Sequence, residues 1–159
     1  MRVMTAQEMQ VVVQNCKWAT ICTVDPQGRP YAVEATPYMD GQDTCFLINP
    51  RGGTWRSLQH SDYVLLKYTL TSRDLHWWAG VSAHGLGHFD PDPVAIKRGF
   101  DLLGAVMQAD YSKAGDYHAG QTGRSPLLRI SVREYTGRCS AGADAALFKE
   151  HSPQGDREL

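Results

Sequence analysis

The sequence predicts an antiparallel β-barrel of the α+β class, with six strands and about three peripheral helices. Its strand-like segments come in runs joined by short turns, whereas alternating βαβ units would place a helix after each strand. The 159 residues, 42% hydrophobic and 21% charged, are ordinary for a globular domain with one core. We therefore expect a single domain over residues 1–159, with residues 141–159 as a peripheral tail.

Six segments have the composition and turn signals of strands: 17–25, 30–40, 44–49, 62–70, 77–90 and 126–137. The turns DPQGRP and DGQD separate the first three, which predicts a meander. Pro37 predicts an irregularity or a sheet edge in the second strand. Residues 71–76 and 110–125 are polar, so we expect a loop at each, the second one long enough to form a flap.

Helix starts are marked by capping residues. Thr5 and Glu8 have the spacing of a capping box, which predicts a helix over residues 5–16. Asp92 as N-cap and Pro93 as first residue predict a longer helix, with an apolar stripe, that runs to about residue 107. A short helix is expected over about residues 54–60.

Charge and cysteine content limit the kinds of partner. The net charge of -1 and the pI of about 6.6 provide no general attraction for nucleic acid or for an anionic membrane, and we expect neither as a partner. No segment has the apolar length of a bilayer span, and the N-terminus has no signal-peptide pattern. The four cysteines form no C-x-x-C pair, which favours reduced thiols in a cytoplasmic protein.

The short helix begins with an unusual sequence, in which Arg51, Gly52, Gly53 and Thr54 stand together. Glycine does not favour a helix, so a local reason for it is needed. One explanation is a loop that ends in a helix cap. The other is a ligand that approaches the backbone closely.

Two histidines, His84 and His88, suggest a metal site at first sight, since four residues along a helix would place both on one face. Their segment is predicted as a strand, where the same spacing spans about 13 Å and does not suit one shared ion. We therefore expect polar strand positions and no metal site. The sequence has no Ser-His-Asp, paired-carboxylate or phosphate-loop motif, so covalent hydrolytic catalysis is not expected.

The aromatic residues are expected mainly in packing. Trp77 and Trp78 are adjacent on a strand and point to opposite faces, so at most one of them faces a cofactor. Tyr31, Tyr38 and Tyr63 are each expected to pack in the barrel.

Three segments carry a resemblance to a known family: ATICTVDPQGRPYAVEATPYMDGQDTCFLINPRGGTWRSL, HGLGHFDPDP and LLRISVREYTGR. In this order and spacing they resemble the flavin mononucleotide (FMN)-binding split-barrel proteins related to pyridoxamine 5'-phosphate oxidase. The nitroimidazole-resistance, or nitroreductase-like, branch is the most similar. The resemblance covers about residues 17–139 and implies a six-stranded antiparallel split barrel.

The resemblance also implies a homodimer with FMN at the subunit interface. The phosphate would lie at the start of the short helix, with Arg51 or Arg56 as a bidentate partner, and the isoalloxazine ring would lie along the second strand. The implied cofactor-binding residues are Glu34, Ala35, Thr36, Asn49, Arg51, Gly52, Gly53, Thr54, Trp55, Arg56 and Trp78. No catalytic residue is assigned.

Three positions depart from the family pattern. Thr54 stands where the family has a basic residue, Leu47 where it has a histidine, and Glu34 where it often has proline. A carboxylate at position 34 would oppose an anionic reduced flavin unless it is paired. Haem and a deazaflavin are the alternative cofactors.

The implied function is that of an oxidoreductase. It would pass electrons or hydride from NAD(P)H to a small-molecule acceptor, with the flavin supplying the redox chemistry. The alternative is a non-catalytic protein that binds flavin or haem, since a fold does not determine turnover.

Overall fold

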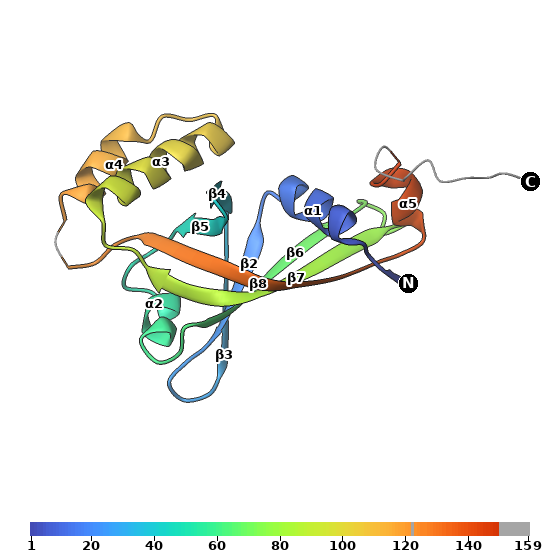
Figure 1. The fold of residues 1–159 in the computed structure, drawn as a ribbon, viewed down its shortest axis with the longest axis horizontal. Helices are drawn as coiled ribbons and strands as arrows, with labels where there is room; N and C mark the ends of the chain where they lie inside the picture. The colour runs from blue at the N-terminus through green and yellow to red at the C-terminus, as the bar shows by residue number, and fades with distance from the viewer. Residues whose placement is uncertain (122, 150–159) are drawn as a thin grey trace, which may run out of the picture. The chain divides into compact units, whose positions relative to one another are not determined.

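The computed structural model describes residues 1–121 and 123–149, so part of the expected tail over 141–159 is outside the described residues. Eight strands form a sheet with the order β3-β2-β6-β7-β8-β5-β4, and β1 pairs with β8. The strands are β1 Arg2–Val3, β2 Ala19–Val24, β3 Pro30–Ala35, β4 Tyr38–Asp40, β5 Asp43–Leu47, β6 Tyr63–Thr71, β7 Trp78–Phe89 and β8 Leu127–Cys139. The helices are α1 Ala6–Asn15, α2 Gly53–Leu58, α3 Pro93–Met107, α4 Ser112–Ala119 and α5 Gly142–Ala146 (Figure 1).

The predicted α+β class is confirmed, and the predicted count of six strands is wrong. The second predicted strand is divided into β3 and β4 at Thr36 and Pro37, because proline has no N–H for the ladder. The strand β1 has only two residues, too few for a sequence pattern. It pairs antiparallel with β8, as β2 pairs with β3 and β6, and β5 with β4 and β8.

The predicted loop over residues 110–125 contains the helix α4. Its Gly115 is buried, and a Cβ there would lie 3.2 Å from Cβ of Phe100 on α3. The two helices therefore pack side by side (Figure 1). The poor helix propensity of glycine is why the sequence favoured a loop here. In the folded chain, close packing against α3 outweighs that propensity.

Contacts divide the chain into two compact units, and the expectation of a single domain stays a prediction. Among the described residues, the first unit comprises 1–16, 68–82 and 135–149, and the second comprises 17–67, 83–121 and 123–134. In the first unit the predicted capping box of α1 is present: Thr5 Oγ1 accepts from the Glu8 N–H, and the Glu8 carboxylate accepts from the Thr5 N–H. A hydrogen bond from Arg2 lowers the pKa of Glu8 to about 2.

The second unit has a core of strand residues from the inner side of the sheet. Ile21, Phe46, Val64, Leu66, Leu128 and Ile130 are all fully buried. A neighbouring cluster joins α3 to β4 and β5 and consists of Tyr38, Cys45, Ile96, Phe100 and Leu127. Burial raises the pKa of Cys45 to about 12, so this thiol is a neutral packing group.

A single guanidinium joins three segments of the second unit. Arg129 on β8 donates to Asp40 at 2.9 Å, to Asp43 at 3.3 Å and to Asp90 at 3.3 Å, and Arg98 on α3 contacts Asp40 at 2.5 Å. Burial alone would lower the pKa of Arg129, but its hydrogen bonds to Asp40 and Asp43 outweigh that effect and raise it. The carboxylates therefore keep Arg129 charged in a largely buried position.

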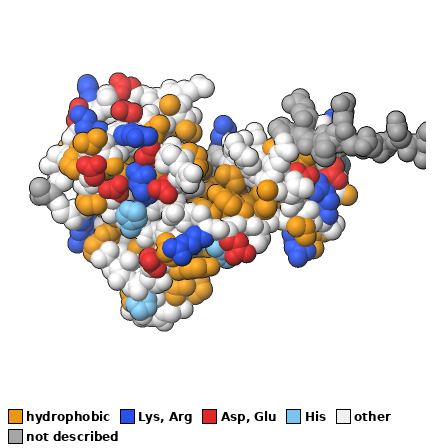
Figure 2. Space-filling view, in the orientation of Figure 1, with side chains coloured by type: hydrophobic (Ala, Val, Ile, Leu, Met, Phe, Trp, Pro, Cys, Tyr) orange, Lys and Arg blue, Asp and Glu red, His pale blue; other side chains and the backbone are white. Residues whose placement is uncertain are grey.

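Charges of both signs also mix on the surface of the helical pair. Figure 2 shows Lys and Arg interspersed with Asp and Glu over α3 and α4, where Lys97 contacts Asp116 at 2.7 Å. No helix within the described parts of the chain combines the length and apolar character that crossing a membrane requires.

We predict that Arg129→Ala destabilises the protein by about 3–5 kcal/mol, because it leaves three carboxylates without their shared cation. Arg129→Lys should cost less, since it keeps the charge but loses the planar fork. Urea unfolding followed by circular dichroism measures both. Arg133→Ala, at an exposed position of the same strand, is the control, and a wild-type midpoint for Arg129→Ala would contradict the assignment.

Candidate functional site

The register of β2 and β3 determines which residues of the predicted flavin strand share a face. Glu34 lies opposite Thr20, and Thr20 lies opposite Lys67 on β6, so the three form one cross-strand row. Thr20 Oγ1 lies 3.5 Å from Glu34 Oε1. The carboxylate of Glu34 therefore has a hydroxyl beside it, and Lys67 lies two strands away in the same row.

Ala35 points to the other face of β3. It lies opposite the buried Ala19, just as Tyr31 lies opposite the buried Thr23. Thr36, the next predicted flavin residue, follows the end of β3 and is half-buried. Glu34 and Ala35 thus point to opposite faces of β3, and Thr36 lies just beyond its end. What the three residues have in common is the backbone of this edge strand and its continuation.

The start of α2 meets β3 through Tyr31. A Cβ added to Gly53 would lie 2.3 Å from Cζ of the Tyr31 ring, closer than any real contact. Gly53 is therefore required by the aromatic ring packed against it, which explains one of the two glycines. Tyr31 is 36% exposed and its ring packs on the start of α2, so its predicted role in barrel packing stays a prediction.

The first turn of α2 has backbone donors without a side-chain cap. Gly52 is the N-cap and supplies no side-chain hydrogen bond to the turn. Asn49 shapes the loop before it, since its Oδ1 accepts from the Arg51 N–H at 2.9 Å and its carbonyl accepts from the Gly52 N–H at 3.1 Å. The N–H groups of the first turn therefore remain for an outside acceptor.

Two exposed arginines lie at this uncapped turn. The Arg56 Nη1 donates to the carbonyl of Arg51 at 3.2 Å, which orients one guanidinium toward the loop. Thr54, at the position of the family's basic residue, is only 2% exposed and lies on the packed side of α2 with Ser57. The positive charge at this end of the helix therefore comes from Arg51 and Arg56.

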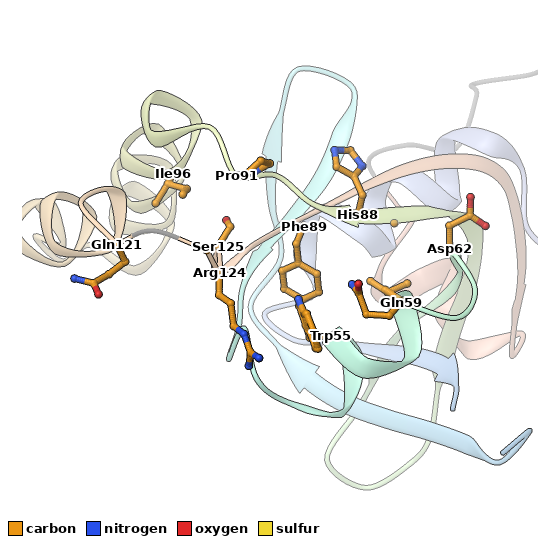
Figure 3. A pocket seen from close by; sticks show the side chains of 13 residues that line it. Trp55, Gln59, Asp62, His88, Phe89, Pro91, Ile96, Gln121, Arg124 and Ser125 are labelled. Carbon is orange, nitrogen blue, oxygen red and sulfur yellow. The ribbon is translucent and has the colours of Figure 1, made fainter. Parts of the chain in front are cut away.

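Trp55 occupies a different face of α2. With Leu58 and Gln59 it lines a cavity in the second unit, as expected for residues three and four apart on a helix (Figure 3). Trp78 begins β7 in the first unit, whereas every other residue predicted to bind the cofactor belongs to the second.

His84 and His88 are polar positions on β7, as predicted. His84 is half-buried, and its Nδ1 lies 2.7 Å from the hydroxyl of Tyr63, while His88 is exposed. Tyr63 is thus an exposed hydrogen-bonding residue and not the packing residue that the sequence suggested, whereas Tyr38 is buried as predicted. Over residues 1–121 and 123–149, no three His, Cys, Asp or Glu side chains are grouped to hold a metal ion.

Sequence reasoning did not identify Tyr31 at the helix start, nor Phe89 and Arg124 around the cavity. Arg124 lies over the Trp55 ring, with Cζ 4.6 Å from the ring centroid. These partners are far apart in the sequence, and no spacing rule connects them. Only Gly53 gave a local signal in the sequence. A glycine at a helix start indicates that another group approaches the backbone closely, but it does not identify that group as Tyr31.

The comparisons with known proteins concern the fold. No family model matches the chain, and no curated protein matches its sequence. Solved structures do match. An FAD-binding protein from Mesorhizobium loti has a TM-score of 0.66 and 19% identity, over 88% of this chain and 98% of that chain.

Two further structures match at comparable levels. A proposed 5-nitroimidazole antibiotic resistance protein from Bacteroides thetaiotaomicron has a TM-score of 0.63 and 16% identity, over 87% of this chain and 86% of that one. The haem storage protein HutZ from Vibrio cholerae has a TM-score of 0.62 and 17% identity, over 88% and 94%. The chain therefore shares its fold with these structures, and the split-barrel fold expected from the sequence is confirmed.

Proposed function

We propose that this protein binds FMN and passes electrons or hydride from NAD(P)H to a small-molecule acceptor. The observation that carries the proposal is the uncapped first turn of α2, with two exposed arginines, beside the edge strand β3. The fold is shared with flavin-binding proteins, which supports a flavin as the ligand at the start of α2 and the edge of β3. Four free cysteines, none of them in a disulfide, support a cytoplasmic location.

The phosphate of FMN fits the donor groups at the start of α2. Arg51 and Arg56 would supply charge and forked N–H donors, and the first-turn N–H groups of Gly53, Thr54 and Trp55 would complete the set. The Tyr31 ring covers one side of Gly53, so the phosphate would approach from the side of the Arg51 loop.

The isoalloxazine ring of FMN fits the free edge of β3. Within the described residues β3 pairs only with β2, so its other edge presents unpaired backbone N–H and C=O groups. These groups complement the alternating donors and acceptors of a flavin's pyrimidine edge. Flavin, when bound, supplies the redox chemistry, while Glu34, Ala35 and Thr36 would orient it and limit access of water.

The Glu34 row reduces the electrostatic penalty that the sequence suggested. Thr20 is next to the carboxylate, and Lys67 is one strand further along the same row. A cation near a carboxylate offsets its repulsion of a developing negative charge. This arrangement supports a site that tolerates a reduced, anionic ligand.

We expect Arg51→Ala to weaken FMN binding about tenfold or more, since a charge-assisted hydrogen bond contributes about 1.5–3 kcal/mol. The measurement is a fluorescence titration of FMN into the apoprotein. Arg73→Ala, at an exposed arginine of the first unit, is the matched control and should bind as the wild type does. Equal affinity of Arg51→Ala and the wild type would remove Arg51 from the phosphate site.

A haem-binding protein without turnover is the second candidate. The observation that favours it is the Tyr63–His84 hydrogen bond, because a His84 that donates its Nδ1–H to the Tyr63 hydroxyl would present an unprotonated Nε2 as an axial ligand. Haem-binding proteins also share the fold.

Absorption spectra and reduction by NADPH separate these functions. We expect flavin bands in the loaded protein, bleaching when NADPH is added without oxygen, and recovery with an acceptor such as menadione. Bound flavin that NADPH does not bleach would indicate a carrier. A Soret band in the purified protein that His84→Ala abolishes and His88→Ala retains would replace FMN with haem.

We also propose a homodimer with the cofactor at its interface. The free edge of β3 is one support, and the exposed apolar residues Trp18 and Val24, 60% and 47% exposed, are another. A second copy of the chain would cover both.

Light scattering should therefore give the mass of two chains for the wild type. Val24→Arg is expected to shift the mass toward one chain, because it places a charge in the proposed contact. Val94→Arg makes the same change at an exposed position on α3, 73% exposed, and should remain dimeric. A monomeric wild type, or a dimer unaffected by Val24→Arg, would contradict the proposed interface.

A further inference from the structure

The side chains of Trp55 and Leu58 on α2, with Gln59 just after it, form one wall of a cavity of about 480 Å³. Small-molecule sites commonly have volumes of roughly 300–1,000 Å³, so this cavity has room for a ligand of one or two rings. Its other walls come from the end of β7, the start of α3 and the residues just before β8 (Figure 3). All of these segments belong to the second unit.

The interior of the cavity suits a flat apolar ligand. Trp55 and Phe89 both line the cavity with aromatic rings, and Leu58, Pro91 and Ile96 add aliphatic surface (Figure 3). Aromatic side chains favour a planar partner because stacked or edge-to-face rings gain more than the burial of area alone.

Arg124 supplies the positive charge of the cavity. Its guanidinium carbon lies 4.6 Å from the centroid of the Trp55 ring, a cation–π distance. Among the described residues no carboxylate forms an ion pair with it. The guanidinium lies over the indole ring of Trp55. Its N–H donors point along its own plane, so they stay available for an anion.

Other features of the cavity direct an anion to Arg124. The N-terminus of α3, beside Ile96, is already capped, since Asp92 accepts from the N–H groups of Val94 and Ala95 at 3.2 and 3.3 Å. In Figure 3 the carboxylate of Asp62 and the guanidinium of Arg124 lie on opposite sides of Trp55 and Gln59. An anionic group would therefore be attracted to Arg124 and repelled from the end that carries Asp62.

We propose that this cavity binds a planar aromatic carboxylate. Its ring system would lie against Trp55 and Phe89, and its carboxylate would accept two N–H bonds from Arg124. The proposal depends on the cavity alone and not on the binding of flavin at the start of α2.

The test is calorimetric titration of the full chain with 2-naphthoate and, separately, with the neutral 2-naphthamide. We expect the acid to bind about tenfold or more tightly than the amide, since only the acid forms charge-assisted bonds with a guanidinium. Arg124→Gln should remove this preference and leave the amide's affinity unchanged. Arg73→Gln, a matched change at an exposed arginine of the first unit, should keep the preference.

Trp55→Leu gives a second, independent variant. It removes both the stacking surface and the support of Arg124, so both ligands should bind more weakly. Circular dichroism and the urea midpoint show that each variant is folded. Equal binding of acid and amide to the wild type, a preference that survives Arg124→Gln, or no binding of either ligand would each overturn the proposal.

Discussion

The contact between Arg129 and its three aspartates determines much of the geometry of the second unit. Asp40 and Asp43 bracket the turn from β4 to β5, and Asp90 directly follows the end of β7, ahead of α3. Holding these segments on β8 fixes where α3 begins, and with it the position of Ile96 at the wall of the cavity. A charged network of this kind has a high desolvation cost, which the hydrogen bonds among its members offset.

The short helix α2 contributes to two chemically different sites, the proposed phosphate site at its start and the cavity lined by Trp55. Its packed side carries Thr54 and Ser57, its cavity side carries Trp55, Leu58 and Gln59, and its uncapped start carries Arg51. A helix this short presents two different faces because successive side chains of a helix point about 100° apart.

Local signals in the sequence predicted those elements whose determinants are local. Thr5 with Glu8, and Asp92 with Pro93, predicted two helix starts, and both caps are present with the expected hydrogen bonds. Pro37 predicted the irregularity that divides β3 from β4. The helix α4 could not be predicted, because it depends on the fit of Gly115 against Phe100 and not on propensity. The position of Arg124 over Trp55 could not be predicted either, since it arises only when the chain is folded.

The packing of Tyr31 on Gly53 has a consequence for how this chain can vary. Every side chain larger than hydrogen at position 53 occupies space that the ring now fills, so the ring must first turn outward or become smaller. The two positions are thus coupled: a substitution that is harmful at one becomes acceptable after a change at the other. Among diverging descendants of this sequence, a large ring at position 31 should occur together with glycine at position 53, and should disappear when that glycine is replaced.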